Sequence, residues 1–329
     1  MNTLPAHITP PLSASRAQEI ARTLDLRSLP RDFLDNPYPV YAALRETEPF
    51  KRMPDGSYFL TRHADLVAVY RDAQTFSSDK QVEFGPKYNK APYNAPPFTL
   101  PGRDAPLYEH HTNSLVFNDP PLHTRVRKLI MGALTRRAID DLTPGLISLV
   151  DGLLDRIQTQ GGGDLIEDFA SAIPVDIIGN LLGVPNAERG PLRGWSLAIL
   201  GALEPSLTPE QEALGHTSVR AFYDYLLGLV ADRRRHPGDP ERDVLTRLIQ
   251  GEAHGEKLSE IELLHNCQFL LNAGHETTTN LIGNALICLQ EHPDARAQLL
   301  QDMHQAPNDE ARDAVLNLAV DEFLRFESS

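Results

Sequence analysis

The segment at residues 270–283, LLNAGHETTTNLIG, places an acid, a histidine and three threonines between two apolar flanks. The carboxyl group of Glu276 and the hydroxyl group of Thr277 are of types that can take part in acid–base chemistry. A zinc site of the HExxH type would need a second histidine at position 279, where the sequence has Thr279. The segment therefore indicates either acid–base chemistry or a purely structural role.

This segment lies in the middle of a long predicted helix. Ser259 and Glu262 have the spacing of a capping box, and Pro293 marks the end of the helical pattern. A helix of about 33 residues, roughly 50 Å long, is long enough to cross a domain. Gly274 and Thr277 fall on the same stripe as the regularly spaced leucines, so both should face the interior. We expect a distorted segment from Gly274 to Thr277 that faces a cavity.

Glycine and threonine in a buried helix also have a structural explanation. A glycine lets two helices approach closely, and a threonine hydroxyl can bond to its own backbone. Taken alone, the helix favours such a crossing of two helices over a catalytic role. Other segments of the chain change this interpretation.

Helical patterns dominate the rest of the chain, with a small β element near the N-terminus. Residues 37–49 and 64–76 have the patterns of helices, and residues 50–62 that of a hairpin around a Pro-Asp-Gly turn. Residues 77–115 show no readable period, and helical patterns return after residue 118. Because the short apolar strands of a βαβ series are missing, the predicted fold class is mainly α.

Composition excludes several classes of protein. Of the 329 residues, 41% are hydrophobic and 23% are charged, as in an ordinary globular protein. We expect no membrane span and no secretory signal, hence a cytoplasmic protein. The net charge of −14 argues against a nucleic-acid partner. With only two cysteines, neither a disulfide framework nor a cysteine zinc site is expected.

Residues 117–130, FNDPPLHTRVRKLI, open a basic helix. His123 and Arg127 are four residues apart and therefore lie on one helix face, where they could bind carboxylates. The usual meaning of such a run of charge is a solvated face. Between positions 120 and 139 the sequence has cations and no acid: Arg125, Arg127, Lys128, Arg136 and Arg137.

Together these segments resemble the cytochrome P450 family of haem-thiolate monooxygenases, in its soluble bacterial type. The sequence AGHETT at 273–278 matches the pattern of the family's central I helix, and residues 117–130 are similar to its C-helix entry. Glu322 and Arg325 match the Glu-x-x-Arg pair of its K helix. The resemblance extends over nearly the whole chain from about residue 30, with the segments in the family's order.

The resemblance implies a cytochrome P450 fold that binds haem. It assigns Glu276 and Thr277 to the relay that delivers protons to bound oxygen. It also implies that Ala273 and Gly274 line the groove in which the oxygen lies. His275 should point away from the iron, and it receives no ligand role.

Four further residues take roles from the resemblance. His123 and Arg127 would bind the haem propionates, and their side chains should converge beside the stripe of the long helix. Glu322 and Arg325 would form a buried ion pair near the proximal side of the haem. That pair is structural in the family and not catalytic.

The family's iron ligand is a cysteine in a glycine-rich loop several dozen residues beyond the Glu-x-x-Arg pair, and this chain ends at Ser329. Cys267 and Cys288 both lie in the long helix, so neither can present a thiolate from such a loop, and no metal ligand is assigned. We expect a surface segment at 1–36 and an incomplete catalytic domain at 37–329, with the C-terminal part missing. Alone, this fragment should bind haem weakly, hydroxylate nothing and expose apolar residues of its last helix: Val320, Phe323 and Leu324.

For the complete protein, the resemblance implies hydroxylation of a small hydrophobic organic substrate with O2. The family contacts its substrates with segments that correspond to residues 80–115 and 188–235. Electrons would come from a ferredoxin- or flavodoxin-type donor, attracted to the basic helix. One alternative is a haem-free helical binding or scaffold protein. Another is a hydrolase that uses Glu276 or a histidine, although no nucleophile elbow is legible.

Overall fold

The structure is a computed structural model that describes residues 12–81, 105–204, 207–251 and 257–327. It is predominantly helical, with a single two-stranded sheet among the described residues, so the predicted fold class is confirmed. The chain divides into two compact units. The first comprises residues 1–77 with 204–207, and the second comprises 78–203 with 208–329.

The first unit has a helical core beside a hairpin. Helix α1 packs on α3, and Ile20 of α1 is buried together with Val40 and Leu44 of α3. Ser13 begins α1, because its side chain accepts a hydrogen bond from the backbone N–H of Arg16 at 3.3 Å. The elements of this unit are α1 (Ala14–Thr23), α2 (Arg31–Asp35), α3 (Tyr38–Thr47), β1 (Phe50–Arg52), β2 (Tyr58–Leu60) and α4 (His63–Arg71).

The predicted hairpin is confirmed. Strands β1 and β2 pair antiparallel with Lys51 opposite Phe59. The turn between them is closed by a hydrogen bond from the Met53 N–H to the Ser57 carbonyl at 2.8 Å. Gly56 has a φ of 89°, a conformation that a glycine adopts without a steric penalty. The Pro-Asp-Gly sequence thus forms the turn that its residue types predicted.

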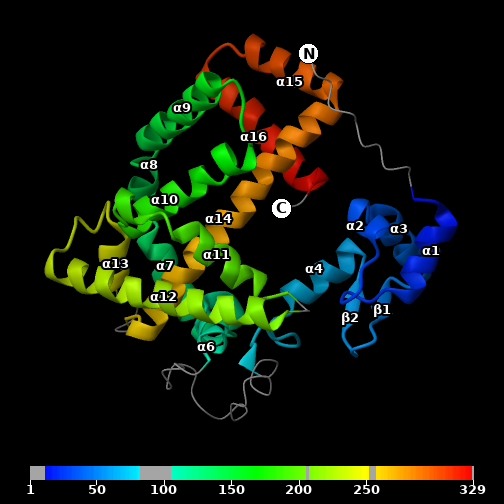
Figure 1. The fold of residues 1–329 in the computed structure, drawn as a ribbon, viewed down its shortest axis with the longest axis horizontal. Coiled ribbons are helices and arrows are strands. Elements are labelled where there is room, and N and C mark those ends of the chain that lie inside the picture. The colour runs from blue at the N-terminus through cyan, green and yellow to red at the C-terminus, as the bar shows by residue number, and fades with distance from the viewer. Residues whose placement is uncertain (1–11, 82–104, 205–206, 252–256, 328–329) are drawn as a thin grey trace. The chain divides into compact units, whose positions relative to one another are not determined.

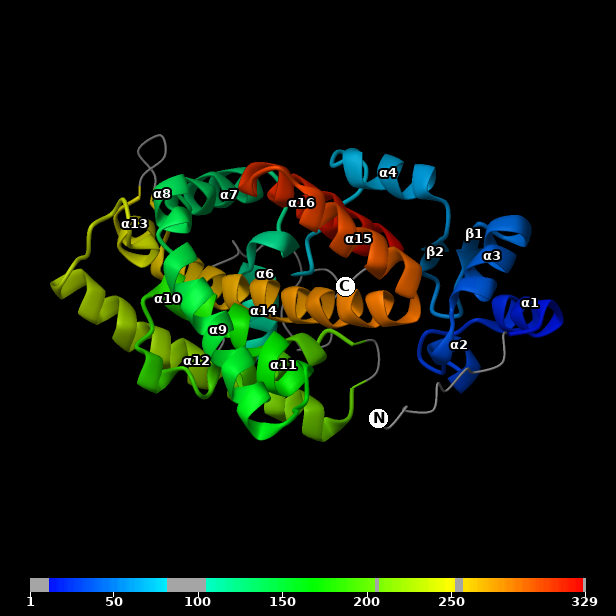
Figure 2. The same ribbon diagram turned by 90° about the horizontal axis from the view of Figure 1, so that it is seen from above.

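The second unit is built around the long helix α14, which passes through its middle in both ribbon views (Figures 1 and 2). Helices α6, α10, α11, α12 and α16 all contact α14. The elements of this unit are α6 (Pro106–Asn113), η1 (Leu115–Phe117), α7 (Leu122–Ala133), α8 (Arg136–Asp140), α9 (Thr143–Gln160), η2 (Ile166–Ala170), α10 (Ala172–Leu182), η3 (Asn186–Glu188), α11 (Leu192–Gly201), α12 (Pro209–Arg235), α13 (Val244–Gln250), α14 (Glu260–Glu291), α15 (Pro293–Gln305) and α16 (Asp309–Phe326).

Helix α14 begins with the predicted capping box. The Ser259 hydroxyl accepts a hydrogen bond from the Glu262 N–H at 3.3 Å, and the Glu262 carboxylate accepts one from the Ser259 N–H at 2.7 Å. The predicted distortion between Gly274 and Thr277 is wrong, because α14 remains α-helical from end to end. The Thr277 hydroxyl donates to the Ala273 carbonyl at 2.7 Å, so it is satisfied within the regular helix.

The sequence showed no period between residues 77 and 115, yet part of that segment is helical. Residues 82–104 lie outside the described part of the chain, whereas Pro106–Asn113 forms α6. Pro106 occupies the first turn, where its missing N–H costs no hydrogen bond. In the described residues, no helix combines the length and the apolar composition needed to cross a bilayer.

Candidate functional site

The middle of α14 has one open face. Ala273 and Thr277 are exposed, and Glu276 is half-buried beside them, although most of the first half of the helix is buried. These residues are three and four apart, so they lie on adjoining parts of one helix face. The hydrogen of the Thr277 hydroxyl is engaged with the Ala273 carbonyl, which leaves the lone pairs of the hydroxyl oxygen available to a water molecule.

Gly274 and His275 point away from this face. A Cβ built on Gly274 would lie 2.8 Å from the Cδ1 of Ile178, so the glycine permits the close packing of α10 on α14. His275 is buried. Burial lowers the pKa of His275, and the positive charge of Arg193 lowers it further. For Gly274, therefore, the structure favours the helix-crossing interpretation of the sequence.

His123 and Arg127 lie one turn apart on α7. His123 is half-buried and Arg127 is exposed. The convergence of their side chains beside the stripe of α14 stays a prediction.

Arg125 does not belong to the group of cations expected to face an electron donor, so this part of the prediction is wrong. Its guanidinium group forms an ion pair with the Glu262 carboxylate in the first turn of α14, with one of the hydrogen bonds 3.4 Å long. The Glu262 side chain is only 3% exposed, so the pair is largely shielded from water. This pair connects α7 to the start of α14. The reason for the correction is that a buried carboxylate requires a cation.

Glu322 and Arg325 form the predicted ion pair on α16. Two parallel hydrogen bonds of 2.7 Å join the guanidinium group to the carboxylate. The side chains of Glu322 and Arg325 are 57% and 67% exposed. The family resemblance implied a buried pair, and this expectation is wrong. The hydrogen bonds from Arg325 lower the pKa of Glu322. Of the apolar residues expected at the surface of this helix, Val320 and Leu324 are exposed and Phe323 is half-buried.

The residues around the open face fit one side of a haem. Ala273 and Thr277 are small and exposed, so a flat apolar ring could lie against them without displacing a large side chain. Neither cysteine would serve as the iron ligand, because Cys267 and Cys288 both lie on α14, the helix that carries the open face. Cys267 is buried inside the unit, and burial raises the pKa of its thiol to about 12, which opposes thiolate formation. The described residues contain no cluster of histidine, cysteine and acidic side chains that could hold a metal ion by itself.

A second face of α14 is polar and buried, and the sequence analysis missed it. Its residues recur every three or four positions, which is the spacing of one helix face. Each is less than 9% exposed: His265, Gln268, Asn272, His275 and Thr279. The same spacing is present in the sequence, but polar residue types do not by themselves indicate burial. Helices α6 and α12 cover the first part of this polar face.

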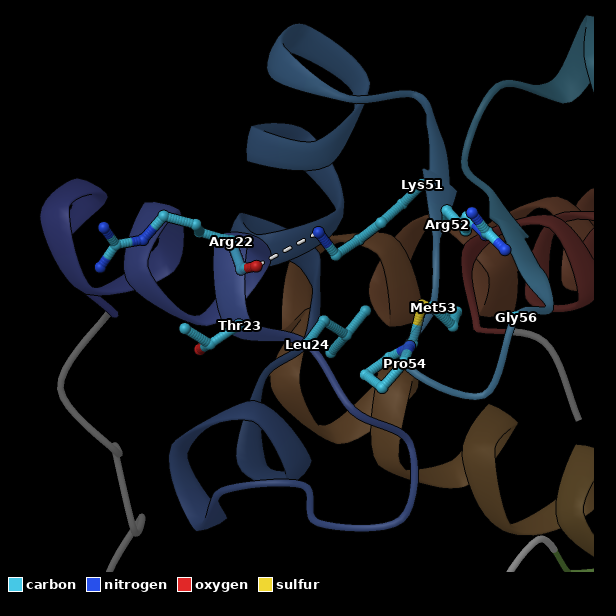
Figure 3. Close-up of a pocket in the computed structure, with 8 residues that line it drawn as sticks. All are labelled: Arg22, Thr23, Leu24, Lys51, Arg52, Met53, Pro54 and Gly56. Carbon is cyan, nitrogen blue, oxygen red and sulfur yellow. Dashed lines mark hydrogen bonds between the residues drawn. The ribbon is translucent and has the colours of Figure 1, made fainter.

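The first unit has a pocket of about 410 Å³ between α1 and the hairpin, shown in Figure 3. Lys51 lies against it, and its ammonium group donates to the Arg22 carbonyl at 3.2 Å. The Glu48 carboxylate also accepts from Lys51, at 2.8 Å. The guanidinium group of Arg22 points away from the other lining residues in this view. Because the lysine charge is already paired, we assign no ligand to this pocket.

Comparisons with known proteins agree with the resemblance. The model of the family described as Cytochrome P450 matches residues 202–328. The chain is 34% identical over 311 residues to Cytochrome P450 107B1 of Saccharopolyspora erythraea, which covers 92% of this chain and 69% of that protein. It is also 34% identical over 299 residues to the Vitamin D(3) 25-hydroxylase of Pseudonocardia autotrophica, covering 90% and 66% of the two chains.

The solved structures agree as well. A crystal structure of P450BioI in complex with an acyl carrier protein ligated to hexadec-9Z-enoic acid superposes with a TM-score of 0.75 at 28% identity. The match covers 91% of this chain and 71% of that chain. This chain thus spans about two thirds of the length of these curated relatives.

Proposed function

We propose, because the chain belongs to the cytochrome P450 family, that the whole protein is a haem-dependent monooxygenase that hydroxylates a small hydrophobic organic substrate with O2. The observation that carries this proposal is the open face of α14, where Ala273 and Thr277 are exposed beside Glu276. A small residue, an acid and a hydroxyl on one face of a central helix combine space for a ligand with groups that handle protons.

Haem, when bound, supplies the iron at which dioxygen is activated. The residues of this chain would then manage space, water and protons. Ala273 leaves room against the helix. The Thr277 oxygen can accept a hydrogen bond from a water molecule, because its own hydrogen is held by the Ala273 carbonyl. The half-buried Glu276 carboxyl group can release a proton to that water and recover one from solvent.

His123 and Arg127 would hold the haem propionates. A guanidinium group binds a carboxylate through two parallel hydrogen bonds, and an imidazole N–H can donate to a second carboxylate. One turn of α7 places the two side chains on one face.

Exposed cations of α7 and α8 would attract an acidic electron donor of the ferredoxin or flavodoxin type in the cytoplasm. Arg125 is not one of them, because it is paired with Glu262. Arg136 forms an exposed ion pair with Asp140 at 3.4 Å, which would reduce but not remove its attraction. Lys128 and Arg137 are also exposed, whereas Arg127 is assigned to a haem propionate.

The substrate class is taken from the relatives. One relative is named for hydroxylating vitamin D(3), and one solved relative holds a fatty acid attached to its carrier protein. Both molecules are largely apolar. Helix α6, together with α11 and α12, would form the corresponding walls in this protein, and residues 82–104 lie outside the described part of the chain.

The experiment compares the haem-loaded whole protein with Thr277→Ala and Thr277→Ser variants. The reduced protein should show the carbon monoxide spectrum of a thiolate-ligated haem in all three. Thr277→Ala should form less product and more hydrogen peroxide, because water is no longer held in place, while Thr277→Ser should resemble the wild type. Failure to bind haem would favour the haem-free scaffold interpretation. Equal product yields from all three proteins would refute the role of Thr277.

A further inference from the structure

Helix α6 is attached to its neighbours largely through buried polar groups. The Asn266 side chain of α14 accepts a hydrogen bond from the Leu115 N–H at 2.9 Å, just after α6. The His216 ring on α12 accepts one from the Leu107 N–H at 3.3 Å. His110 of α6 is 2% exposed, and its Nε2 lies 3.3 Å from the side-chain nitrogen of Asn272 on α14. Such contacts depend on protonation, because an imidazole nitrogen that takes up a proton can no longer accept.

His265 of α14 has a partner for a positive charge. Gln268 donates to the Val219 carbonyl at 2.9 Å, which orients its amide oxygen toward His265 Nδ1 at 3.0 Å. His265 Nδ1 therefore carries a hydrogen. The other ring nitrogen, Nε2, lies 3.6 Å from the Glu109 carboxylate, which is within range of an ion pair. A protonated His265 is thus compensated by a neighbouring carboxylate.

His110 has no carboxylate partner among its described contacts, and only an interaction with Gln268 raises its pKa, by less than burial and the two neighbouring histidines lower it. The Asn272 amide can satisfy one ring nitrogen, whereas Nδ1 of His110 is buried without a hydrogen-bond partner. When the Asn272 amide nitrogen donates to Nε2, the neutral ring carries its hydrogen on Nδ1. Protonation of Nε2 replaces this acceptor with a second N–H donor and removes the hydrogen bond with Asn272. The rings of His111 and His265 lie 5.5 and 5.6 Å from the His110 ring, and a second charge there would be repelled.

The remaining titratable groups around α6 do not change this conclusion. From α12, Tyr223 contacts the His265 ring at 5.3 Å, and His216 faces the first turn of α6. From α6 itself, Glu109 is directed to His265. Burial lowers the pKa of His110 well below its usual range, and the charges of His111 and His265 lower it further.

We infer that His110 is a positioning residue: in its neutral form it holds α6 against α14, and its protonation releases α6. The protonation step adds one proton from water to the bare nitrogen of the ring. The open form gains that proton near the ordinary imidazole pKa of about 6.5, and the docked form resists it. The population of the open form should therefore rise about tenfold for each pH unit below about 6.5. Under the proposed function, on which this consequence rests, opening would loosen one wall of the substrate site.

Hydrogen exchange of the backbone amides of α6, measured by mass spectrometry, tests this inference without requiring haem. After correction for intrinsic exchange rates, protection of α6 in the wild type should be about tenfold lower at about pH 5.5 than at about pH 7.5. His110→Gln should lose most of this response, because glutamine can pair with Asn272 and takes up no proton. Asn272→Asp should keep α6 protected at low pH, because it supplies the missing carboxylate. His304→Gln is the matched control, since His304 is exposed on α15.

The contribution of His216 is separated by His216→Asn, whose side-chain oxygen can replace Nδ1 as the acceptor. In the wild type the half-buried His216 ring can turn toward water. The His216→Asn variant should therefore keep most of the pH response of the wild type. Equal protection of α6 at the two pH values in the wild type would overturn the inference. So would a response of His110→Gln as large as that of the wild type. Failure of substrate turnover alone would count against the proposed function and leave the exchange result standing.

Discussion

Glu276 and Thr277 are adjacent in sequence but differ in what the helix allows them to do. The threonine hydroxyl is bonded to the Ala273 carbonyl, so it can orient a water molecule but has already committed its hydrogen. The glutamate side chain is half-buried on the same side, and under the proposed function its carboxyl group transfers the proton. The two roles are therefore separable by substitution.

Glu276→Gln should slow hydroxylation by the haem-loaded whole protein by about 100-fold, because an amide keeps the shape of the side chain and cannot transfer a proton. Glu276→Asp should retain most of the activity, since the carboxyl group remains. Initial rates of product formation measure the effect, and the carbon monoxide spectrum verifies equal haem content. A Glu276→Gln rate equal to that of the wild type would remove Glu276 from the relay.

At the scale of elements, the crossing of α10 over α14 depends on the absence of a side chain at Gly274. A Cβ there would meet the Cδ1 of Ile178 at 2.8 Å, closer than carbon atoms pack. Gly274→Ala should therefore destabilise the protein by about 1–3 kcal/mol, despite the better helix propensity of alanine. Ile178→Val removes the Cδ1 atom, so the double variant should recover part of the loss. Urea unfolding of the wild type, the two single variants and the double variant gives the coupling energy between positions 274 and 178. Additive effects would show that the two residues do not touch.

The elements differ in how far the sequence predicts them. The start of α14 was predictable because a capping box is a local interaction between Ser259 and Glu262. The hairpin was predictable for the same reason. Helix α6 was missed, because its residues are held by tertiary contacts with α12 and α14 rather than by an apolar period. Local sequence patterns therefore predicted those elements whose conformation is decided by local contacts.

The site was predictable to a similar degree. The sequence predicted that Gly274 and Thr277 both face the interior, and this is wrong for Thr277, which is exposed. The exposure depends on which helices surround α14, and the apolar stripe alone does not indicate it. The ion pair of Arg125 with Glu262 joins residues 137 positions apart, and no local pattern indicates such a pair. The buried polar face from His265 to Thr279 was visible as a spacing, yet only the packing of α6 and α12 shows that it is buried.

At the scale of the whole molecule, the buried histidines make stability depend on pH. The pKa values of His110 and His275 are both lowered, chiefly by burial, so the folded protein binds fewer protons than the unfolded chain at mildly acidic pH. Their stabilising effect is complete above the unfolded pKa of about 6.5 and is lost as pH falls toward the folded values. Carboxylates with lowered pKa values, such as Asp164 and Glu322, add a further loss at more acidic pH.

We therefore expect the free energy of unfolding to fall by up to about 1.4 kcal/mol per pH unit for each of these histidines between about pH 6.5 and about pH 5. Trp195 stacks on Phe222 at 5.2 Å within the unit that holds both histidines, so its fluorescence during urea unfolding reports the relevant transition. His110→Gln and His275→Leu should each remove the contribution of one histidine to the pH dependence of the free energy of unfolding. His304→Gln should leave that pH dependence unchanged. The outcome that contradicts this expectation is that the variant that combines His110→Gln with His275→Leu loses as much stability as the wild type between these pH values. In that case neither histidine is held neutral by the fold, and the pH dependence must arise from other groups.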